Sequence, residues 1–180
     1  MATVAIALFG AGLKTTAQMI GNGLLTLHRH PDEWGRLIAD PGLARNATEE
    51  ILRFESSLVA FSRTALSDTS VGGKPVAAGQ RVLCVVAAGN HDPAIFQAPG
   101  RFDIGRGGGK HLSFGGGIHF CVGAELARLE GESALETITR RLPGRVIETD
   151  LPQWCEGLLF RGLIPTIVKP DSRGRFPKAL

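Results

Sequence analysis

The most informative stretch of this 180-residue sequence reads Phe114-Gly115-Gly116-Gly117-Ile118-His119-Phe120-Cys121-Val122-Gly123. Its three consecutive glycines permit backbone angles closed to other residues and let a flat object come close to the main chain. The residues that follow are rich in Ala, Leu and Glu as far as Pro143, which predicts a helix over Val122–Leu142. Cys121 is therefore expected at a helix start, where free amide groups and the helix dipole favour the thiolate form of a cysteine. A thiolate held in this way is a good ligand for iron.

The composition is that of a folded, soluble protein. Apolar residues make up 43% of the chain and charged residues 21%, and the net charge of +3 is scattered, so neither disorder nor a nucleic-acid partner is indicated. Cys84, Cys121 and Cys155 are too few and too far apart for a disulfide scaffold, which predicts a reducing, cytoplasmic location. The apolar run Ala2–Leu13 lacks a basic leader region and is too short to span a bilayer, so no membrane partner is expected.

The pattern of helices and strands predicts a mainly α protein with small antiparallel β sheets. A long helix is expected over Ala2–Arg29, ending before a proline and, because its apolar residues form no single stripe, buried on several sides. Two shorter helices are expected over Asp32–Asp40 and Leu43–Phe54. Leu58–Val86 alternates short apolar runs with glycine-rich turns, which indicates antiparallel strands. Residues 90–120 have no regular period and predict a long functional loop.

The glycine-rich stretch resembles the haem-binding signature of the cytochrome P450 superfamily, in which a Phe precedes the ligand cysteine by seven residues. The matching residues are Phe114, Gly117, His119, Cys121 and Gly123, and the histidine resembles bacterial members. The resemblance implies that Cys121 binds the iron of haem b, iron protoporphyrin IX, and that Gly115 also lies against this cofactor. It also implies a truncated cytochrome P450 fold: its proximal half, with the long oxygen-activating helix.

Two further segments resemble the family in chain order. Glu50-Ile51-Leu52-Arg53 resembles its Glu-x-x-Arg helix, and a pair three residues apart lies on one helix face. Pro99-Gly100-Arg101-Phe102 resembles the segment whose Arg joins that pair. The resemblance therefore implies that Glu50, Arg53 and Arg101 form a buried structural triad behind the haem.

Three side chains are implied by position as partners of the haem propionates. Arg63 lies in a predicted strand after the Glu-x-x-Arg helix, and a guanidinium group suits carboxylate recognition. The alternative for Arg63 is a solvent-facing strand residue, the default for arginine. His119 is the second candidate by position and His111 the third.

The long first helix contains Ala11-Gly12-Leu13-Lys14-Thr15-Thr16, which resembles the family's oxygen-activating segment. By resemblance, Ala11 and Gly12 open a groove over the iron, and Thr15 is a catalytic residue that hydrogen-bonds bound oxygen. The alternative for Thr15 is a hydroxyl bonded to its own helix backbone. Lys14 stands where the family usually has an acid. A lysine with a pKa of ~10.4 normally stays protonated, so proton delivery is expected to be slow, rerouted or absent.

The family's reaction inserts one oxygen atom of O2 into an organic substrate, and the resemblance implies a hydrophobic substrate here. Electrons would come from NAD(P)H through a ferredoxin or flavoprotein. We expect residues 1–169 to be the C-terminal portion of such a domain and residues 170–180 to be a disordered tail. Family chains are more than twice as long, so whether this chain is an active enzyme stays open.

Four alternatives remain at this point. The chain is a haem-binding but catalytically impaired fragment, or a separately encoded partner supplies a missing N-terminal half, because a water-excluded site is what such chemistry needs. A zinc site begun by His119 and Cys121 lacks a closely spaced second pair of ligands. Cys121 could also be an inert core cysteine.

Overall fold

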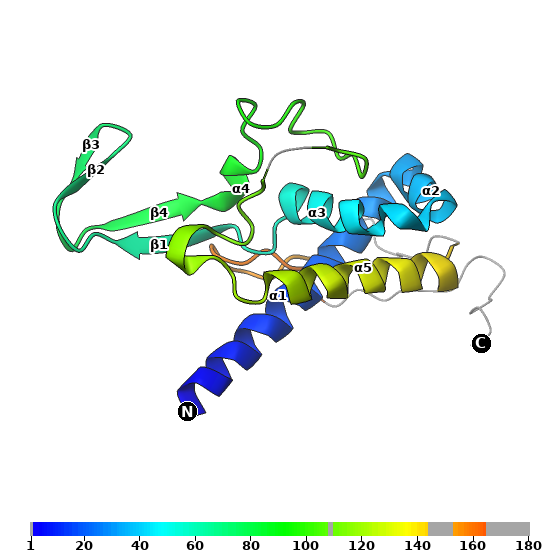
Figure 1. The fold of residues 1–180 in the computed structure, drawn as a ribbon, viewed down its shortest axis with the longest axis horizontal. Helices are drawn as coiled ribbons and strands as arrows, with labels where there is room; N and C mark the ends of the chain where they lie inside the picture. The colour runs from blue at the N-terminus through cyan, green and yellow to red at the C-terminus, as the bar shows by residue number, and fades with distance from the viewer. Residues whose placement is uncertain (1, 108–109, 144–152, 165–180) are drawn as a thin grey trace.

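The structure, a computed structural model, describes residues 2–107, 110–143 and 153–164. Helices and short antiparallel sheets follow one another as predicted (Figure 1). The elements are, in chain order, α1 (Ala2–Arg29), α2 (Pro31–Ala39), η1 (Pro41–Leu43), α3 (Ala44–Phe54), β1 (Ala60–Thr64), β2 (Thr69–Val71), β3 (Lys74–Val76), β4 (Arg81–Val85), α4 (Val86–Gly89), η2 (Gly117–His119) and α5 (Ala124–Arg141).

The core lies where the second half of α1 packs against α2, α3 and α5. Leu27, Leu37 and Ile104 are completely buried there. Gly131 of α5 allows the closest approach of these helices, because a Cβ at this position would lie 2.6 Å from Thr48 of α3 and 2.9 Å from Met19 of α1. Three helices therefore meet around one glycine.

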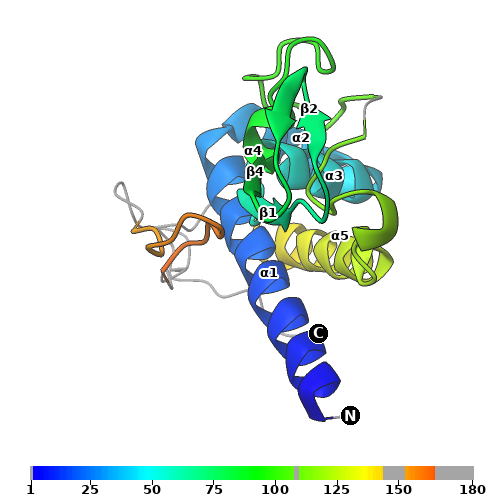
Figure 2. The same ribbon diagram turned by 90° about the vertical axis from the view of Figure 1, so that its left-hand side faces the viewer.

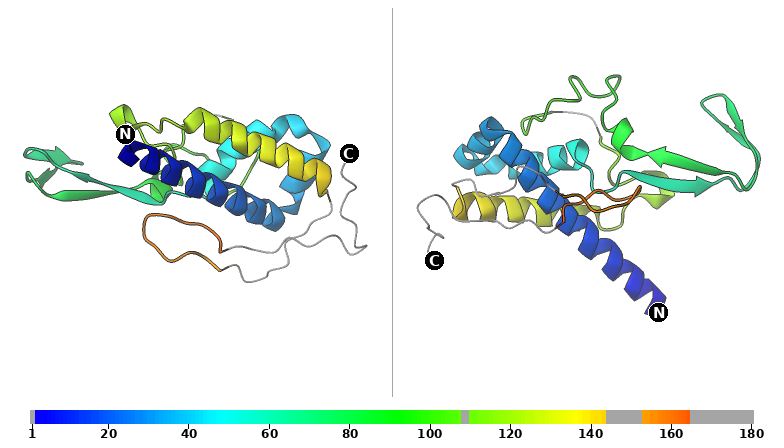
Figure 3. Two further views of the ribbon diagram at one scale, coloured as in Figure 1. Left: turned by 90° about the horizontal axis from the view of Figure 1, so that it is seen from below. Right: turned by 180° about the vertical axis from the view of Figure 1, so that it is seen from behind.

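The first half of α1 projects away from this core, as Figure 2 and the right-hand view of Figure 3 show. Residues 2–14 are all exposed, including Ile6 and Phe9, each with 72% of its surface accessible. The expectation that this helix is buried on several sides is therefore wrong for its first half. By length and composition alone α1 could cross a membrane, a test that the core helix of a soluble protein also passes.

The described residues form two antiparallel pairs of strands. β1 pairs with β4, with Arg63 opposite Val82 and Phe61 opposite Cys84. β2 and β3 form a hairpin whose turn uses positive φ angles of 55° at Gly72 and 76° at Gly73, which glycine adopts without strain. The predicted turn at Gly72-Gly73 is thus confirmed as a hairpin turn, whereas the turn at Gly79 joins β3 to β4, which belong to different sheets.

Most predicted boundaries are close to those observed. The end of α1 at Arg29 is confirmed, α5 begins at Ala124, two residues later than expected, and Val86 starts the short α4 instead of ending a strand. Residues 90–107 and 110–116 lack helix and strand, as predicted, while the short 3-10 turn η2 falls inside the range 90–120 that was expected to be irregular.

The C-terminal segment 153–164 lies against α1 and the end of α3. An isolated bridge joins Leu58 to Phe160, and a second joins Trp154 to Leu163. The main-chain amide of Arg161 donates to Ser57 O over 2.9 Å. The tail predicted over 170–180 lies outside the described residues.

We predict that Gly131→Ala destabilises the fold by about 1–3 kcal/mol, because the new methyl group overpacks the contact with Thr48 and Met19. The matched control is Gly35→Ala on the exposed side of α2, where a Cβ would meet nothing within 4 Å. This control should instead gain about 0.5–1 kcal/mol from helix propensity. Urea unfolding measures both, and equal effects would contradict the packing described.

Candidate functional site

The loop that carries Cys121 is folded back on itself by its own backbone. The Cys121 amide donates to Phe114 O over 2.9 Å, and the Phe120 amide donates to Gly117 O over 3.0 Å. Gly115 and Gly117 have φ angles of 71° and 61°, in the region that favours glycine. The third glycine of the run is different, because Gly116 has the extended φ of −163°, which other residues also adopt.

Cys121 lies just ahead of α5 and is exposed. Its carbonyl accepts from the Ala124 amide over 3.3 Å, and Gly123 is the N-cap residue of the helix. A Cβ built at Gly123 would lie 4.0 Å from the Cys121 Sγ, so the sulfur sits beside the first turn. The placement of the thiol at a helix start agrees with the sequence analysis.

Apolar side chains flank the sulfur and face outward. Ile118 has 99% of its surface exposed, Val122 91% and Phe120 52%. The thiol is accessible, apolar groups surround it, and the glycines of the loop carry no side chains. These features fit a flat, largely apolar group such as haem. In the described part of the chain, no group of three His, Cys, Asp or Glu side chains is placed to hold a metal ion by itself.

Phe114 supports this loop from beneath. Its ring is 8% exposed and packs on the rings of His111 and Phe120 at centroid distances of 5.4 and 6.2 Å. The Arg128 guanidinium from α5 lies 4.7 Å from the same ring. Arg128 also donates to Glu49 over 2.6 Å, so the loop is tied to α3 and α5 together.

The three propionate candidates are in different situations. The Arg63 guanidinium lies 4.3 Å from the Phe61 ring and donates to Ser62 O. His119 is exposed beside Cys121. Both nitrogens of the His111 ring are engaged, Nε2 with Glu49 at 3.1 Å and Nδ1 with the Ser113 amide at 3.2 Å. The structure therefore leaves Arg63 and His119 more available than His111 to an anionic group.

The Glu49 carboxylate is held ionised by its neighbours. Burial raises its pKa, but the hydrogen bonds and charges of His111 and Arg128 outweigh this and lower the pKa to about 2. The sequence analysis did not identify Glu49 or Arg128, because no local pattern links residues on α3 and α5.

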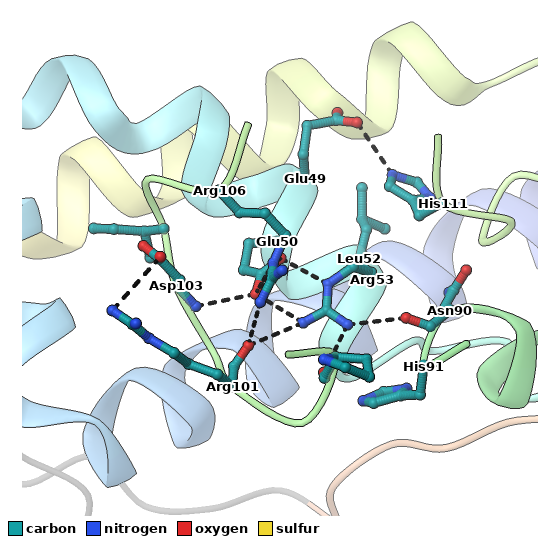
Figure 4. Close-up of polar contacts among 12 residues, drawn as sticks. Glu49, Glu50, Leu52, Arg53, Asn90, His91, Arg101, Asp103, Arg106 and His111 are labelled. Carbon is teal, nitrogen blue, oxygen red and sulfur yellow. Dashed lines mark hydrogen bonds and ion pairs between the residues drawn. The ribbon is translucent and has the colours of Figure 1, made fainter. Parts of the chain in front are cut away.

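Glu50 and Arg53 form the buried pair that the sequence predicted. Two hydrogen bonds of 2.8 Å join the Arg53 guanidinium to the two oxygens of Glu50, and both side chains are only 2% exposed. Figure 4 shows a second guanidinium on the same carboxylate, that of Arg106. Arg106 Nε lies 3.1 Å from each Glu50 oxygen, and its side chain is 13% exposed.

The third member of this cluster is Arg106 and not Arg101. The Arg101 guanidinium turns outward to Asp103 at 3.7 Å, and its side chain is 68% exposed (Figure 4). Only the Arg101 carbonyl joins the cluster, accepting from Arg53 and Arg106 over 3.2 and 2.7 Å. Both arginines lie in a loop without a regular period, so the sequence offered no physical signal for which side chain turns inward.

The irregular segment before the Cys121 loop is held by side chains in place of secondary structure. Arg53 donates to the carbonyls of Asn90 and Pro99, each over 2.9 Å. The Asn90 Oδ1 accepts from the Leu112 amide over 2.7 Å, and its Nδ2 donates to the Ser113 hydroxyl. That hydroxyl donates in turn to the Leu52 carbonyl over 2.6 Å. A completely buried asparagine thus fixes the start of the loop that leads to the cysteine.

The segment expected to handle oxygen lies on α1. Ala11 and Gly12 are exposed, and a Cβ at Gly12 would meet nothing within 4 Å. The Thr15 hydroxyl donates to Ala11 O over 2.7 Å, the intrahelical bond named as its alternative role, and its lone pairs can still accept. The Lys14 ammonium lies 5.0 Å from the centre of the Phe160 ring.

The fold and the cysteine loop identify the class of protein. The Cytochrome P450 family profile matches residues 42–158, and the chain belongs to this family. It is 39% identical over 174 residues to 6-deoxyerythronolide B hydroxylase of Saccharopolyspora erythraea, covering 96% of this chain and 43% of that one. It is 41% identical over 142 residues to the biotin biosynthesis cytochrome P450 of Bacillus subtilis, covering 79% and 36%.

A solved structure extends this similarity to three dimensions. The tirandamycin C-bound P450 monooxygenase TamI superimposes with a TM-score of 0.87 at 38% identity, over 91% of this chain and 42% of that one. The expected fold, a partial cytochrome P450, is confirmed. The chain spans roughly two fifths of the length of the relatives it matches, by the coverage of 43% and 42% given for two of them.

We predict that Arg106→Ala costs about 1.5–3 kcal/mol of stability, because it removes charge-assisted hydrogen bonds from the buried Glu50 carboxylate. Arg101→Ala should cost no more than about 0.5 kcal/mol, because that side chain is on the surface. Chemical denaturation of both variants is the measurement. A larger loss for Arg101→Ala would contradict the assignment of the third arginine.

We also predict an acid-dependent contribution from Glu49. Its pKa is lowered in the fold to about 2 from the ordinary value of 4.5, so its stabilising contacts are complete above the ordinary value. They are lost as the pH falls from about 4.5 towards about 2. Urea midpoints measured across this range should fall more steeply for the wild type than for Glu49→Gln. Parallel curves for the two proteins would contradict the prediction.

Proposed function

We propose that this chain is the C-terminal, cysteine-bearing portion of a haem-thiolate monooxygenase. Cys121 is the iron ligand. This proposal is supported by the exposure of Cys121 and by its position at the start of α5. Gly115, Gly117 and Gly123 allow the backbone to lie close to the porphyrin ring of the haem. Phe114 packs beneath this loop. Arg63 and His119 bind the propionates of haem b, and His111 supports Glu49.

When bound, the haem supplies oxygen activation, in which thiolate ligation favours O–O cleavage. The residues of this chain hold and orient it. Cys121 donates its thiolate, and Arg128 braces the loop through the Phe114 ring and Glu49. Thr15 offers a hydroxyl oxygen that can accept a hydrogen bond while its own proton is donated to Ala11 O. Ala11 and Gly12 leave room beside Thr15, since Ala11 has only a methyl side chain and Gly12 has none.

The reaction proposed inserts one oxygen atom of O2 into a hydrophobic organic substrate. By resemblance to the family, the apolar segments Ala5–Phe9, Leu58–Phe61 and Leu158–Phe160 line its pocket, and the second and third meet in the Leu58–Phe160 bridge. Lys14 of α1 also touches Phe160. Electrons come from NAD(P)H through a ferredoxin or flavoprotein, and the protein works in the cytoplasm. One relative, 38% identical, is described as an intact self-sufficient cytochrome P450 monooxygenase.

A second candidate function is a haem-binding fragment that does not turn over by itself. The observation that favours it is the exposed apolar surface of α1, including Val4, Ile6 and Phe9. Such a surface normally marks an interaction site, so a separately supplied polypeptide equivalent to the rest of the domain would complete the fold. Haem uptake without NAD(P)H-coupled product formation supports this second function. Product formation by the chain alone eliminates it.

The test of the proposed ligand is the spectrum of the reduced, carbon-monoxide-bound protein after haem is supplied. The wild type should give the thiolate type of spectrum, and Cys121→Ser should lose it. Cys84→Ser and Cys155→Ser are matched controls, because both residues are free cysteines outside the Cys121 loop, and they should leave the spectrum unchanged. A histidine-ligated spectrum in the wild type would contradict the proposal.

A further inference from the structure

Three unpartnered polar atoms lie buried where α1 meets the C-terminal segment. Asn22 is completely buried, and Ser57 and Gln18 are 6% and 7% exposed. The oxygens Gln18 Oε1, Asn22 Oδ1 and Ser57 Oγ find no hydrogen-bond partner among the described residues. Leaving a buried polar group unpaired is costly, so a native fold normally satisfies it by other means.

These three residues surround one short piece of backbone, residues 161–162. Asn22 Nδ2 donates to Arg161 O over 2.9 Å, and the Arg161 amide donates to Ser57 O over 2.9 Å. A Cβ at Gly162 would lie 2.3 Å from the Gln18 side chain, so this side chain packs directly on that glycine. Gln18 and Asn22 are four residues apart and share one face of α1.

The orientation of the Asn22 amide is fixed by its other contacts. Its Nδ2 faces two carbonyl oxygens, that of Arg161 at 2.9 Å and that of Glu55 at 3.4 Å. A flipped amide would put an oxygen against both carbonyls, so Oδ1 is a true acceptor that points elsewhere.

We propose that a single ordered water molecule binds at this junction. A buried water typically makes about three hydrogen bonds to groups that are otherwise unsatisfied. Its two hydrogens suit the amide oxygens of Gln18 and Asn22, and its oxygen suits the hydroxyl of Ser57 as a donor. The three orphan groups therefore match the bonding capacity of one water.

Water fits this junction better than a cation does. The carboxylate of Glu55, whose main-chain oxygen lies 3.4 Å from Asn22 Nδ2, is already paired with the Arg161 guanidinium. Neutral oxygens alone, beside an arginine, give a cation little compensation for its lost hydration.

The site ties the C-terminal segment to the helix that carries Thr15. Gln18 follows Thr15 by three residues on the same face, so the water continues the polar face of α1 into the interior. Phe160 of the same segment contacts Lys14 of α1, with the ammonium 5.0 Å from the centre of the ring. The water site holds whether or not haem binds, so it does not rest on the proposed function.

The sign of one stability change tests the proposal. Gln18→Met keeps the length of the side chain and removes its oxygen. If the oxygen binds water, the urea midpoint falls, and this is the result we expect. If the oxygen is truly unpaired, the apolar side chain raises the midpoint, which would overturn the proposal. Gln97→Met is the control, because Gln97 is exposed, and its midpoint should stay unchanged.

A second variant and a direct probe complete the test. Ser57→Ala should lower the midpoint less in the Gln18→Met background than in the wild type, because both residues bind the same water. Nuclear Overhauser contacts between water and the Asn22 side-chain amide should be present in the wild type. Strictly additive midpoints together with absent contacts would overturn the proposal. Stabilisation by K⁺ or Na⁺ that Gln18→Met abolishes would also overturn it, in favour of a cation site.

Discussion

The buried carboxylate of Glu50, shared by Arg53 and Arg106, is the interaction on which the site depends. A charge that is 98% removed from solvent is tolerated only when it is paired and hydrogen-bonded, and two guanidinium groups and the Asp103 amide do this here. The same guanidinium groups then bind carbonyls of the segment between Asn90 and Arg101. One ionic cluster on α3 thus shapes a long segment that has no helix or strand of its own.

That shaped segment leads directly into the cysteine loop. Ser113 bonds both Asn90 and α3, and the next residue is the buried Phe114 that supports Cys121. From there the glycines with positive φ turn the chain, and α5 begins three residues after the cysteine. The buried ion cluster therefore holds the loop in place, and the loop in turn positions the exposed sulfur, which is fixed by backbone hydrogen bonds.

Much of this could be predicted from the sequence, and the exceptions share a physical reason. Helix ends were predicted to within about two residues because proline and glycine act locally, within the usual error of such boundaries. The Glu50–Arg53 pair was predictable because residues three apart share a helix face. The inward turn of Arg106 and the exposure of residues 2–14 depend on which segments lie nearby in space, and no local period records that. The glycine run was predicted as a unit, yet only two of its three members need a positive φ.

The sulfur of Cys121 is the atom that we propose to bind iron. X-ray absorption at the iron edge of the haem-loaded chain measures this bond directly. We predict one sulfur atom in the first coordination shell of the wild type and in Cys84→Ser, and none in Cys121→Ser. A first shell of nitrogen and oxygen alone in the wild type, or a sulfur that persists in Cys121→Ser, would contradict the account.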